Sequence, residues 1–432
     1  MSENARIRYQ AKVEAELAKA LSKRGVCSEK NASDIEQACR QVSASEVYEE
    51  EKKTRHDVRA LANVIKRKVP VDSQPFVHFG ATSYDIVDTA NALRYKKAVE
   101  ELLLPALINL ELKLISLAEK TAHIPQIGRT HGQHAEPITF GFTIAEYVER
   151  LGNRIQEIVR AKENLAGKFS GAVGAYNATS LIVKDPLKLE KDILTALGLK
   201  VPNYSTQVAM PEPTQDLFNA MLGAFTVLAN FSDDMRHLQR TEISEIAEAV
   251  SKDQVGSSTM PHKRNPITFE NVKSMWKQFV PRIVTIYLDS LSEHQRDLTN
   301  SASQRFLPES IVALVYSAGK LSGAVDKLIV DEVSIRKNIE ASKVLIVAEP
   351  LYILLAKYGH PDAHEAVRKV SFKARDSNHS VLEIAESDST LKNFIRMFSQ
   401  EERMILQDPI TYTGLSEKKT HSVCILWKKV FK

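Results

Sequence analysis

The chain has 432 residues, with 58 Lys and Arg against 54 Asp and Glu, so its formal net charge at pH 7 is only +4. This near balance gives no reason to expect a nucleic acid or a membrane surface as partner, although it leaves room for a local basic pocket that binds an anionic substrate. Gly and Pro number only 16 each, which favours long regular elements over tight turns, and no apolar run is long enough to span a membrane.

The cysteines and the N-terminus indicate the compartment. Cys27, Cys39 and Cys424 are odd in number and lack the spacing of metal ligands. The first ten residues are charged and contain no apolar segment of the kind found in secretory signals. We therefore expect a reduced, soluble, cytoplasmic protein.

The hydrophobic period is helical almost everywhere. We predict long helices from Leu102 to about Leu117, from just after Pro137 to about Leu165, over about 214–238, and from Pro266 onward, where Pro281 should introduce a kink. The third of these carries an apolar stripe over more than six turns, at Leu217, Met221, Phe225, Leu228, Phe231, Met235 and Leu238, and residues 214–216 are expected to cap its start. Helices of this length pack side by side, so the pattern predicts an all-α bundle.

Six polar motifs fall near the ends of these predicted helices. They are TRHDVRA at 54–60, HFGATSYDIVDTA at 78–90, GRTHGQHAEP at 128–137, GKFSGAVG at 167–174, GSSTMPHKRNP at 256–266 and HQRDLTNSASQR at 294–305. Each motif alone has an ordinary structural interpretation. His56 and His78 are individually more often structural than catalytic, Asp85 favours a helix N-terminus, and Arg296 with Arg305 fits a charged surface as well as a phosphate.

The segment 256–266 is the most informative of the six. It has little to bury, so the protein core does not explain it. Ser257 and Ser258 offer adjacent backbone N–H groups, and Lys263 and Arg264 supply positive charge, a combination that suits an anion or an alkoxide held by donors. The alternative is a solvated basic surface loop.

Taken together, the motifs resemble one family. GSSTMPHKRNP is similar to the signature loop of the fumarase/aspartase superfamily, and the six motifs occur in the order found in adenylosuccinate lyases. The C-terminal stretch from Val344 through YGHPDAHEAVRK to YTGLSEKK also resembles that family, so the similarity covers nearly the whole chain.

The resemblance implies a particular architecture. We expect an all-α subunit of three domains, at 1–94, 95–343 and 344–432, whose central long-helix bundle forms the 20-helix core of a homotetramer. Each active site would be composite, built from loops of three subunits. The resemblance implies no metal and no organic cofactor.

The resemblance also implies a reaction, the β-elimination of fumarate from adenylosuccinate to give AMP, and from the succinylated carboxamide ribotide of purine synthesis. Such a reaction must stabilise a dianionic aci-carboxylate with preorganised charge and donors. By the family pattern Ser257 is the general base, His131 the general acid and Glu270 its orienting partner, while His56 and His78 line the site. The implied substrate-binding residues are Arg55, Asp57, Thr82, Ser83, Asp85, Thr130, Gln207, Ser258, Lys263 and Asn265, with Arg296, Ser301 and Arg305 at the nucleotide phosphate.

Two departures keep alternatives open. Adenylosuccinate lyases usually carry an Arg-Tyr pair in a short leading segment, whereas Arg8 and Tyr9 fall within the first predicted helix. The family commonly has an Arg-Asp-Arg-His run where this chain reads AMPEPTQD at 209–216, which removes two cations. The alternatives are a lyase for another succinylated amine such as argininosuccinate, another superfamily member (fumarase, aspartase or carboxymuconate cycloisomerase), and a scaffold that has lost catalysis.

Overall fold

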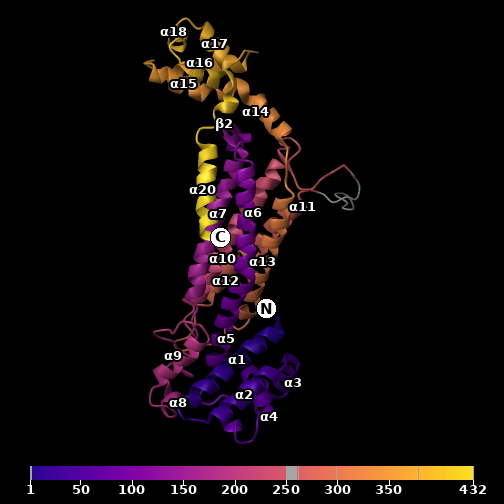
Figure 1. Cartoon of the computed structure of the whole chain (residues 1–432), viewed down its shortest axis with the longest axis vertical. Coiled ribbons are helices and arrows are strands. Elements are labelled where there is room, and N and C mark those ends of the chain that lie inside the picture. Colours follow the sequence, from indigo (N-terminus) through magenta and orange to yellow (C-terminus); the bar gives the residue numbers. More distant parts are fainter. Residues whose placement is uncertain (1, 250–259, 261, 298, 378, 432) are drawn as a thin grey trace. The chain divides into compact units, whose positions relative to one another are not determined.

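The computed structural model describes residues 2–249, 260, 262–297, 299–377 and 379–431. Helices dominate these residues, and the strands are short (Figure 1). In chain order the elements are α1 (Glu3–Ser22), α2 (Glu29–Gln41), α3 (Ala44–Thr54), α4 (Asp57–Lys68), η1 (Gln74–Phe76), α5 (Ser83–Ala98), η2 (Val99–Leu103), α6 (Leu104–Lys120), β1 (Pro125–Thr130), β2 (Gln133–Thr139), α7 (Phe140–Glu163), α8 (Asn177–Ser180), α9 (Pro186–Ala196), α10 (Glu212–Leu238), β3 (Ile246–Ala247), α11 (Ile267–Phe279), α12 (Arg282–Leu288), α13 (Ser303–Asp326), β4 (Ile329–Val330), α14 (Glu332–Ile346), α15 (Ala348–Lys357), α16 (Ala363–Arg375), α17 (Val381–Ser387), α18 (Leu391–Ile395), α19 (Gln400–Gln407), η3 (Pro409–Thr411) and α20 (Ser416–Phe431).

The chain divides into two compact units. The first unit comprises residues 1–107, 153–226 and 274–319, and the second comprises 108–152, 227–273 and 320–432. The predicted division into three domains at 94/95 and 343/344 stays a prediction.

In the first unit, α1 packs against α2 and α5, and α3 packs against α4. The helix starts follow from the sequence, because Ser28, Ser43 and Thr82 each stand three residues before an Asn, Glu or Asp and form capping boxes. The side chains of α1 that face these neighbours are fully buried, including Leu17 and Leu21.

The second unit contains a β-hairpin, the C-terminal helices and a close helix contact. Strands β1 and β2 pair antiparallel, and α14 packs against β1. Helix α20 lies beside α7 (Figure 1), where a Cβ at Gly152 would come within 2.4 Å of the Trp427 ring, so only glycine permits this approach. Helices α15 to α19 enclose a separate core that includes Leu351, Val367 and Val381.

The helices agree closely with the predicted pattern, and the all-α class is confirmed. Every residue of the α10 stripe is buried, with relative exposures between 0% and 9%. The helix begins at Glu212 instead of being capped at 214–216, so the predicted start was late by about one turn. Pro281 ends the helix predicted from Pro266 onward instead of only kinking it, because Pro281 occupies the N-cap position of a new helix, α12.

Two local features were not predicted. The hairpin β1–β2 covers the motif GRTHGQHAEP, and a single π-helical turn, η2, precedes α6. The first helix does contain Arg8 and Tyr9, as expected. All three cysteines are free and buried, and none of the described helices is long and apolar enough to cross a membrane.

Candidate active site

The motif TRHDVRA forms the junction between α3 and α4. Arg55 ends α3 with a left-handed backbone (φ 51°), and His56 caps α4 by accepting the Arg59 backbone N–H at 3.4 Å. Arg55 and His56 are both exposed, and the Asp57 carboxylate lies 3.6 Å from the Arg6 guanidinium. The junction therefore presents a cation and an imidazole to solvent on a rigid base.

His78 occupies the loop before α5 and is tied to the first helix. Its Nδ1 lies 2.7 Å from a carboxylate oxygen of Glu14, which is itself 1% exposed. Burial acts to lower the pKa of His78, but the charge and hydrogen bond of Glu14 outweigh it and the pKa is raised above its ordinary value. The pair with Glu14 therefore favours the protonated form of His78 more than water favours that of a free imidazole.

Thr82 and Ser83 stand at the start of α5, where the helix dipole favours negative charge. The Asp85 side chain accepts the Thr82 backbone N–H at 2.8 Å and also pairs with the ammonium of Lys168. Both members of that ion pair are buried, with exposures of 1% for Asp85 and 0% for Lys168. Asp85 is therefore occupied by protein partners.

One turn further along α5, Asp88 accepts the backbone N–H of Ala209 at 2.9 Å, which attaches the segment containing Gln207 to this helix. Burial raises the pKa of Asp88 to about 6, against the opposing effects of that N–H group and the charges of Lys168 and Arg296. The Arg296 guanidinium lies over the Tyr84 ring, 5.8 Å from its centroid, and donates to Asn300.

Several predicted substrate-binding residues of the first unit thus meet around the first turns of α5. Thr82 and Ser83 belong to the helix start, the Gln207 segment is held by Asp88, and Arg296 reaches Tyr84. Ser301 is exposed just before α13, and Arg305 lies within that helix.

His131 in the second unit lies at the tip of the β1–β2 hairpin. Thr130 pairs with Gln133, and the two residues between them have positive φ, 53° for His131 and 73° for Gly132. This is the pattern of a type I′ turn, whose twist matches that of the strands. Thr130 and His131 are both exposed.

A buried carboxylate holds the base of this hairpin. Glu245, which is 0% exposed, accepts from Arg129 at 2.5 Å, from Gln126 at 2.7 Å and from Asn338 at 2.8 Å. The three donors satisfy a carboxylate that would be costly to bury alone. The hairpin therefore projects His131 from a well-anchored base.

The end of the signature segment leads into α11. Lys263 is exposed, and its backbone N–H donates to the Met260 carbonyl at 3.0 Å. Glu270 is exposed in the first turn of α11, where its charge suits the helix dipole. Glu248 accepts the Thr268 N–H at 3.0 Å and caps this helix. Ser257 and Ser258 lie outside the described residues.

The predicted residues thus form two groups, one in each unit. The α5 group comprises Arg55, His56, Asp57, His78, Thr82, Ser83, Asp85, Gln207, Arg296, Ser301 and Arg305 of the first unit. The hairpin group comprises Thr130, His131, Lys263, Asn265 and Glu270 of the second. The site predicted from the sequence does not include Tyr84, Asp88 or Lys168, whose contributions become visible only through their contacts.

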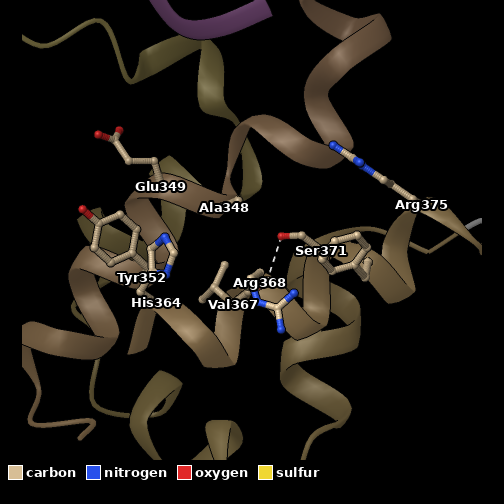
Figure 2. A pocket seen from close by; sticks show the side chains of 9 residues that line it. Ala348, Glu349, Tyr352, His364, Val367, Arg368, Ser371 and Arg375 are labelled. Carbon is tan, nitrogen blue, oxygen red and sulfur yellow. Dashed lines mark hydrogen bonds between the residues drawn. The ribbon is translucent and has the colours of Figure 1, made fainter. Parts of the chain in front are cut away.

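A cavity of about 370 Å³ lies elsewhere in the second unit, between α15 and α16 (Figure 2). Its polar lining includes Glu349, which accepts from Tyr412 at 2.9 Å, and Arg368, which pairs with Glu365 at 2.6 Å. Its nine lining residues include no member of either group, so we do not assign the predicted chemistry to it. Across the parts of the chain that the structure describes, no three His, Cys, Asp or Glu side chains gather in a way that could hold a metal ion.

Comparison with known proteins places the chain in a family. Residues 1–280 match the model described as Lyase, and residues 292–404 match that described as Adenylosuccinate lyase C-terminal. An adenylosuccinate lyase of Pyrococcus horikoshii is 36% identical over 401 residues, covering 90% of this chain and 87% of the relative. An N-acetyl-S-(2-succino)cysteine lyase of Enterococcus italicus is 29% identical over 433 residues, covering 99% and 93%.

A solved structure supports the fold. The 3-carboxy-cis,cis-muconate lactonizing enzyme of Pseudomonas putida superposes with a TM-score of 0.86 at 23% identity, covering 99% of this chain and 96% of the other. The fumarase/aspartase-like fold predicted from the motifs is therefore confirmed. With relatives of this similarity along nearly its whole length, the chain belongs to the adenylosuccinate lyase family.

Proposed function

We propose that this protein cleaves adenylosuccinate into AMP and fumarate by β-elimination, in purine nucleotide synthesis, and that it also cleaves the succinylated carboxamide ribotide. The observation that carries the proposal is the match of residues 292–404 to the C-terminal region of adenylosuccinate lyases. That segment contains Arg296, Ser301 and Arg305, the residues expected at the nucleotide phosphate. A paired guanidinium site suits a phosphate monoester, which most other fumarate-releasing substrates lack.

The chemistry begins with a weakly acidic C–H bond next to a carboxylate. The Ser257 oxygen takes this proton, the freed electron pair forms the C=C bond of fumarate, and the C–N bond breaks with its electrons on nitrogen. His131 supplies the proton that neutralises the departing nitrogen, and Glu270 orients that imidazole. Lys263 and Asn265 stabilise the charge that develops on the carboxylate, and Lys263 also favours the serine alkoxide.

The α5 group binds the substrate in this proposal. Thr82, Ser83 and Gln207 contact the succinyl part, with help from Thr130 and Ser258. Arg296, Ser301 and Arg305 contact the phosphate. His56 and His78 line the pocket, and the pair with Glu14 fixes the position of the His78 ring.

The active sites are composite and form in a homotetramer. A set of large apolar side chains that the chain leaves exposed on and after α12 supports this assembly: Val284 at 59%, Tyr287 at 51%, Leu288 at 60% and Leu291 at 72%. Exposed apolar surface of this kind marks a protein interface.

A second candidate is the release of fumarate from a succinylated thiol or a different amine. The Enterococcus italicus relative is named for a succinylated cysteine and matches 99% of this chain. The segment 209–216, AMPEPTQD, lacks the cations that adenylosuccinate lyases commonly place there, which would suit a substrate with less negative charge.

One assay separates these candidates. Purified protein is offered adenylosuccinate, the succinylated carboxamide ribotide, argininosuccinate and N-acetyl-S-(2-succino)cysteine in parallel, and fumarate release is measured. The proposal predicts the highest kcat/KM with adenylosuccinate. Turnover of the cysteine conjugate alone would establish the second candidate and remove the first.

A further inference from the structure

Lys168 is a fully buried lysine in a loop of small residues. It belongs to GKFSGAVG at 167–174, and its relative exposure is 0%. Lysine is almost never buried completely unless it is paired, because removing its charge from water costs several kcal/mol. The proposed reaction assigns this side chain no role, and its burial excludes direct contact with a substrate.

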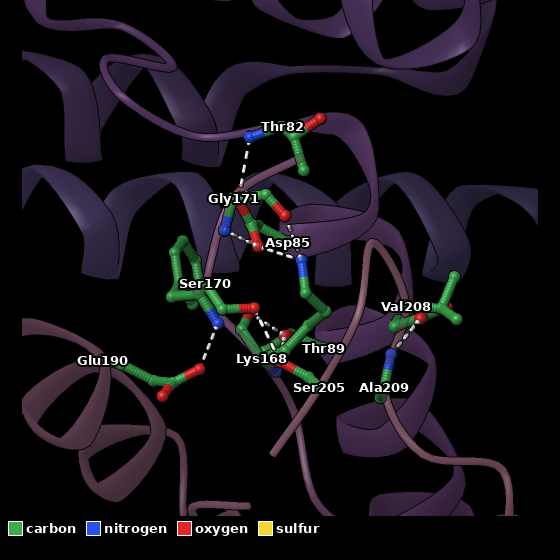
Figure 3. A network of polar contacts seen from close by, with 12 residues as sticks. Thr82, Asp85, Thr89, Lys168, Ser170, Gly171, Glu190, Ser205, Val208 and Ala209 are labelled. Carbon is green, nitrogen blue, oxygen red and sulfur yellow. Dashed lines mark hydrogen bonds and ion pairs between the residues drawn. The ribbon is translucent and has the colours of Figure 1, made fainter. Parts of the chain in front are cut away.

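The ammonium of Lys168 joins this loop to the start of α5 (Figure 3). It pairs with the Asp85 carboxylate and donates to the Gly171 carbonyl at 3.1 Å. The Gly171 N–H in turn points to Asp85 at 3.3 Å, and Asp85 also accepts the Thr82 N–H at 2.8 Å. One carboxylate therefore holds both the loop and the residue that begins the helix.

The backbone of Lys168 adds a second attachment one turn further along α5. Its N–H donates to the Thr89 hydroxyl at 2.9 Å, and that hydroxyl donates to the Lys168 carbonyl at 3.0 Å. A Cβ at Gly167 would come within 2.7 Å of this hydroxyl oxygen, so glycine is needed for the loop to lie so close.

The loop then holds the segment that carries Gln207. Ser170 and Ser205 share a hydrogen bond of 2.6 Å between their hydroxyls. At Gly174, which has φ +78°, a Cβ would stand 2.0 Å from the Ser205 carbonyl oxygen, so the two segments are in tight contact. Ala209, two residues beyond Gln207, donates its backbone N–H to Asp88 on the same helix.

We propose that Lys168 and Asp85 are positioning residues that lock the 167–174 loop onto α5 and thereby set the places of Thr82, Ser83 and Gln207. This assigns Asp85 a role behind the substrate-binding residues instead of among them. The inference rests on the proposed function only in naming those three residues as substrate contacts.

The first test is kinetic and uses Lys168→Met, which keeps the length of the side chain and removes its charge. Displaced binding groups should lower kcat/KM about 100-fold. Lys168→Arg should recover part of this loss, since it can still pair with Asp85. Arg24→Met, which removes an ion pair to Asp192 (2.7 Å) in the same unit, should stay within about twofold of wild type. A folded Lys168→Met variant whose kcat/KM is close to that of wild type would overturn the proposal.

The double variant Asp85→Asn/Lys168→Met separates positioning from stability. It leaves no unpaired buried charge, so its thermal midpoint should exceed that of Lys168→Met. Positioning predicts that kcat/KM stays low despite this recovery. If activity returns together with stability, the pair is merely structural and the proposal fails.

The second test does not depend on which substrate the enzyme takes. Hydrogen exchange of the free protein should accelerate in Lys168→Met within 79–85, 167–174 and 205–209, and stay unchanged in α16. Unchanged exchange in all three segments would overturn the proposal. If the wild-type protein does not release fumarate from adenylosuccinate, the proposed function is refuted but the positioning proposal is not. Hydrogen exchange tests that proposal without any turnover of substrate.

Discussion

The α5 group and the hairpin group differ in how the chain holds them. Around α5, Thr82 and the Gln207 segment are attached to buried or partly buried carboxylates, and the loops lie within van der Waals reach of one another. In the second unit His131 lies at an exposed turn, and Lys263 and Glu270 are exposed as well. The fold thus holds the proposed binding residues around α5 in a fixed arrangement, whereas the proposed acid and its neighbours in the second unit are open to solvent.

This contrast favours a division of labour between the two groups. Substrate-binding residues gain affinity from preorganisation, which reduces the ordering cost of binding. An acid on an anchored hairpin can instead be presented to a surface supplied by another copy of the chain. Substitutions in the hairpin group and in the signature segment should therefore lower kcat. Substitutions in the α5 group should instead weaken substrate binding.

The largest effect is expected from Ser257→Ala. Removing the proposed base should lower kcat by about 10²–10⁴-fold, while substrate binding and the thermal midpoint change little. Steady-state kinetics and equilibrium binding of AMP measure the two effects separately. High residual kcat would assign the base to another residue.

A smaller effect, confined to affinity, is expected from Arg296→Gln. Loss of a charged hydrogen bond to the phosphate costs about 1.5–3 kcal/mol, which corresponds to a KM raised about 10–100-fold. Succinyladenosine, which has no phosphate, should be cleaved equally well by wild type and variant. Arg282→Gln, whose guanidinium lies 5.1 Å from the Phe306 ring centroid in the same unit, is the matched control. An equal loss on both substrates would contradict the phosphate assignment.

The smallest effect concerns pH and the pair of His78 with Glu14. The pKa of His78 is raised in the folded state, so the pair stabilises the fold below the unfolded value of about 6.5 and loses that contribution as pH rises through the folded value. Glu14→Gln should therefore lower stability by about 1.5 kcal/mol near pH 6 and by less at pH 8.5. Thermal unfolding over this range measures the difference, and a cost that grows with pH would refute the assignment.

The long helices could be predicted because apolar periodicity reports burial directly. The stripe of α10 is buried at every predicted position, and Pro281 ends a helix because it lacks an N–H donor. The β1–β2 hairpin escaped prediction because its turn residues are His131 and Gly132, and not the Asn-Gly or Asp-Gly pair that most clearly signals a type I′ turn.

The site was only partly predictable for a related reason. Resemblance of the motifs supplies residue types and expected roles. It does not show which polar side chains are already hydrogen-bonded or ion-paired to other parts of the protein. Asp85 and Lys168 are 83 positions apart, and nothing in either local sequence indicates that they pair. The motif therefore predicts Asp85 as a substrate contact, and only the structure shows the contacts of its carboxylate with Lys168 and with the Thr82 N–H.

Mixing two inactive variants tests the shared site most directly. His131→Ala and Ser257→Ala tetramers are dissociated, combined and reassembled, and native mass spectrometry of differently tagged chains verifies the exchange of subunits. If the acid and the base come from different copies, some mixed sites receive both intact residues and fumarate release returns. Fully exchanged tetramers that stay as inactive as either parent would contradict the composite site.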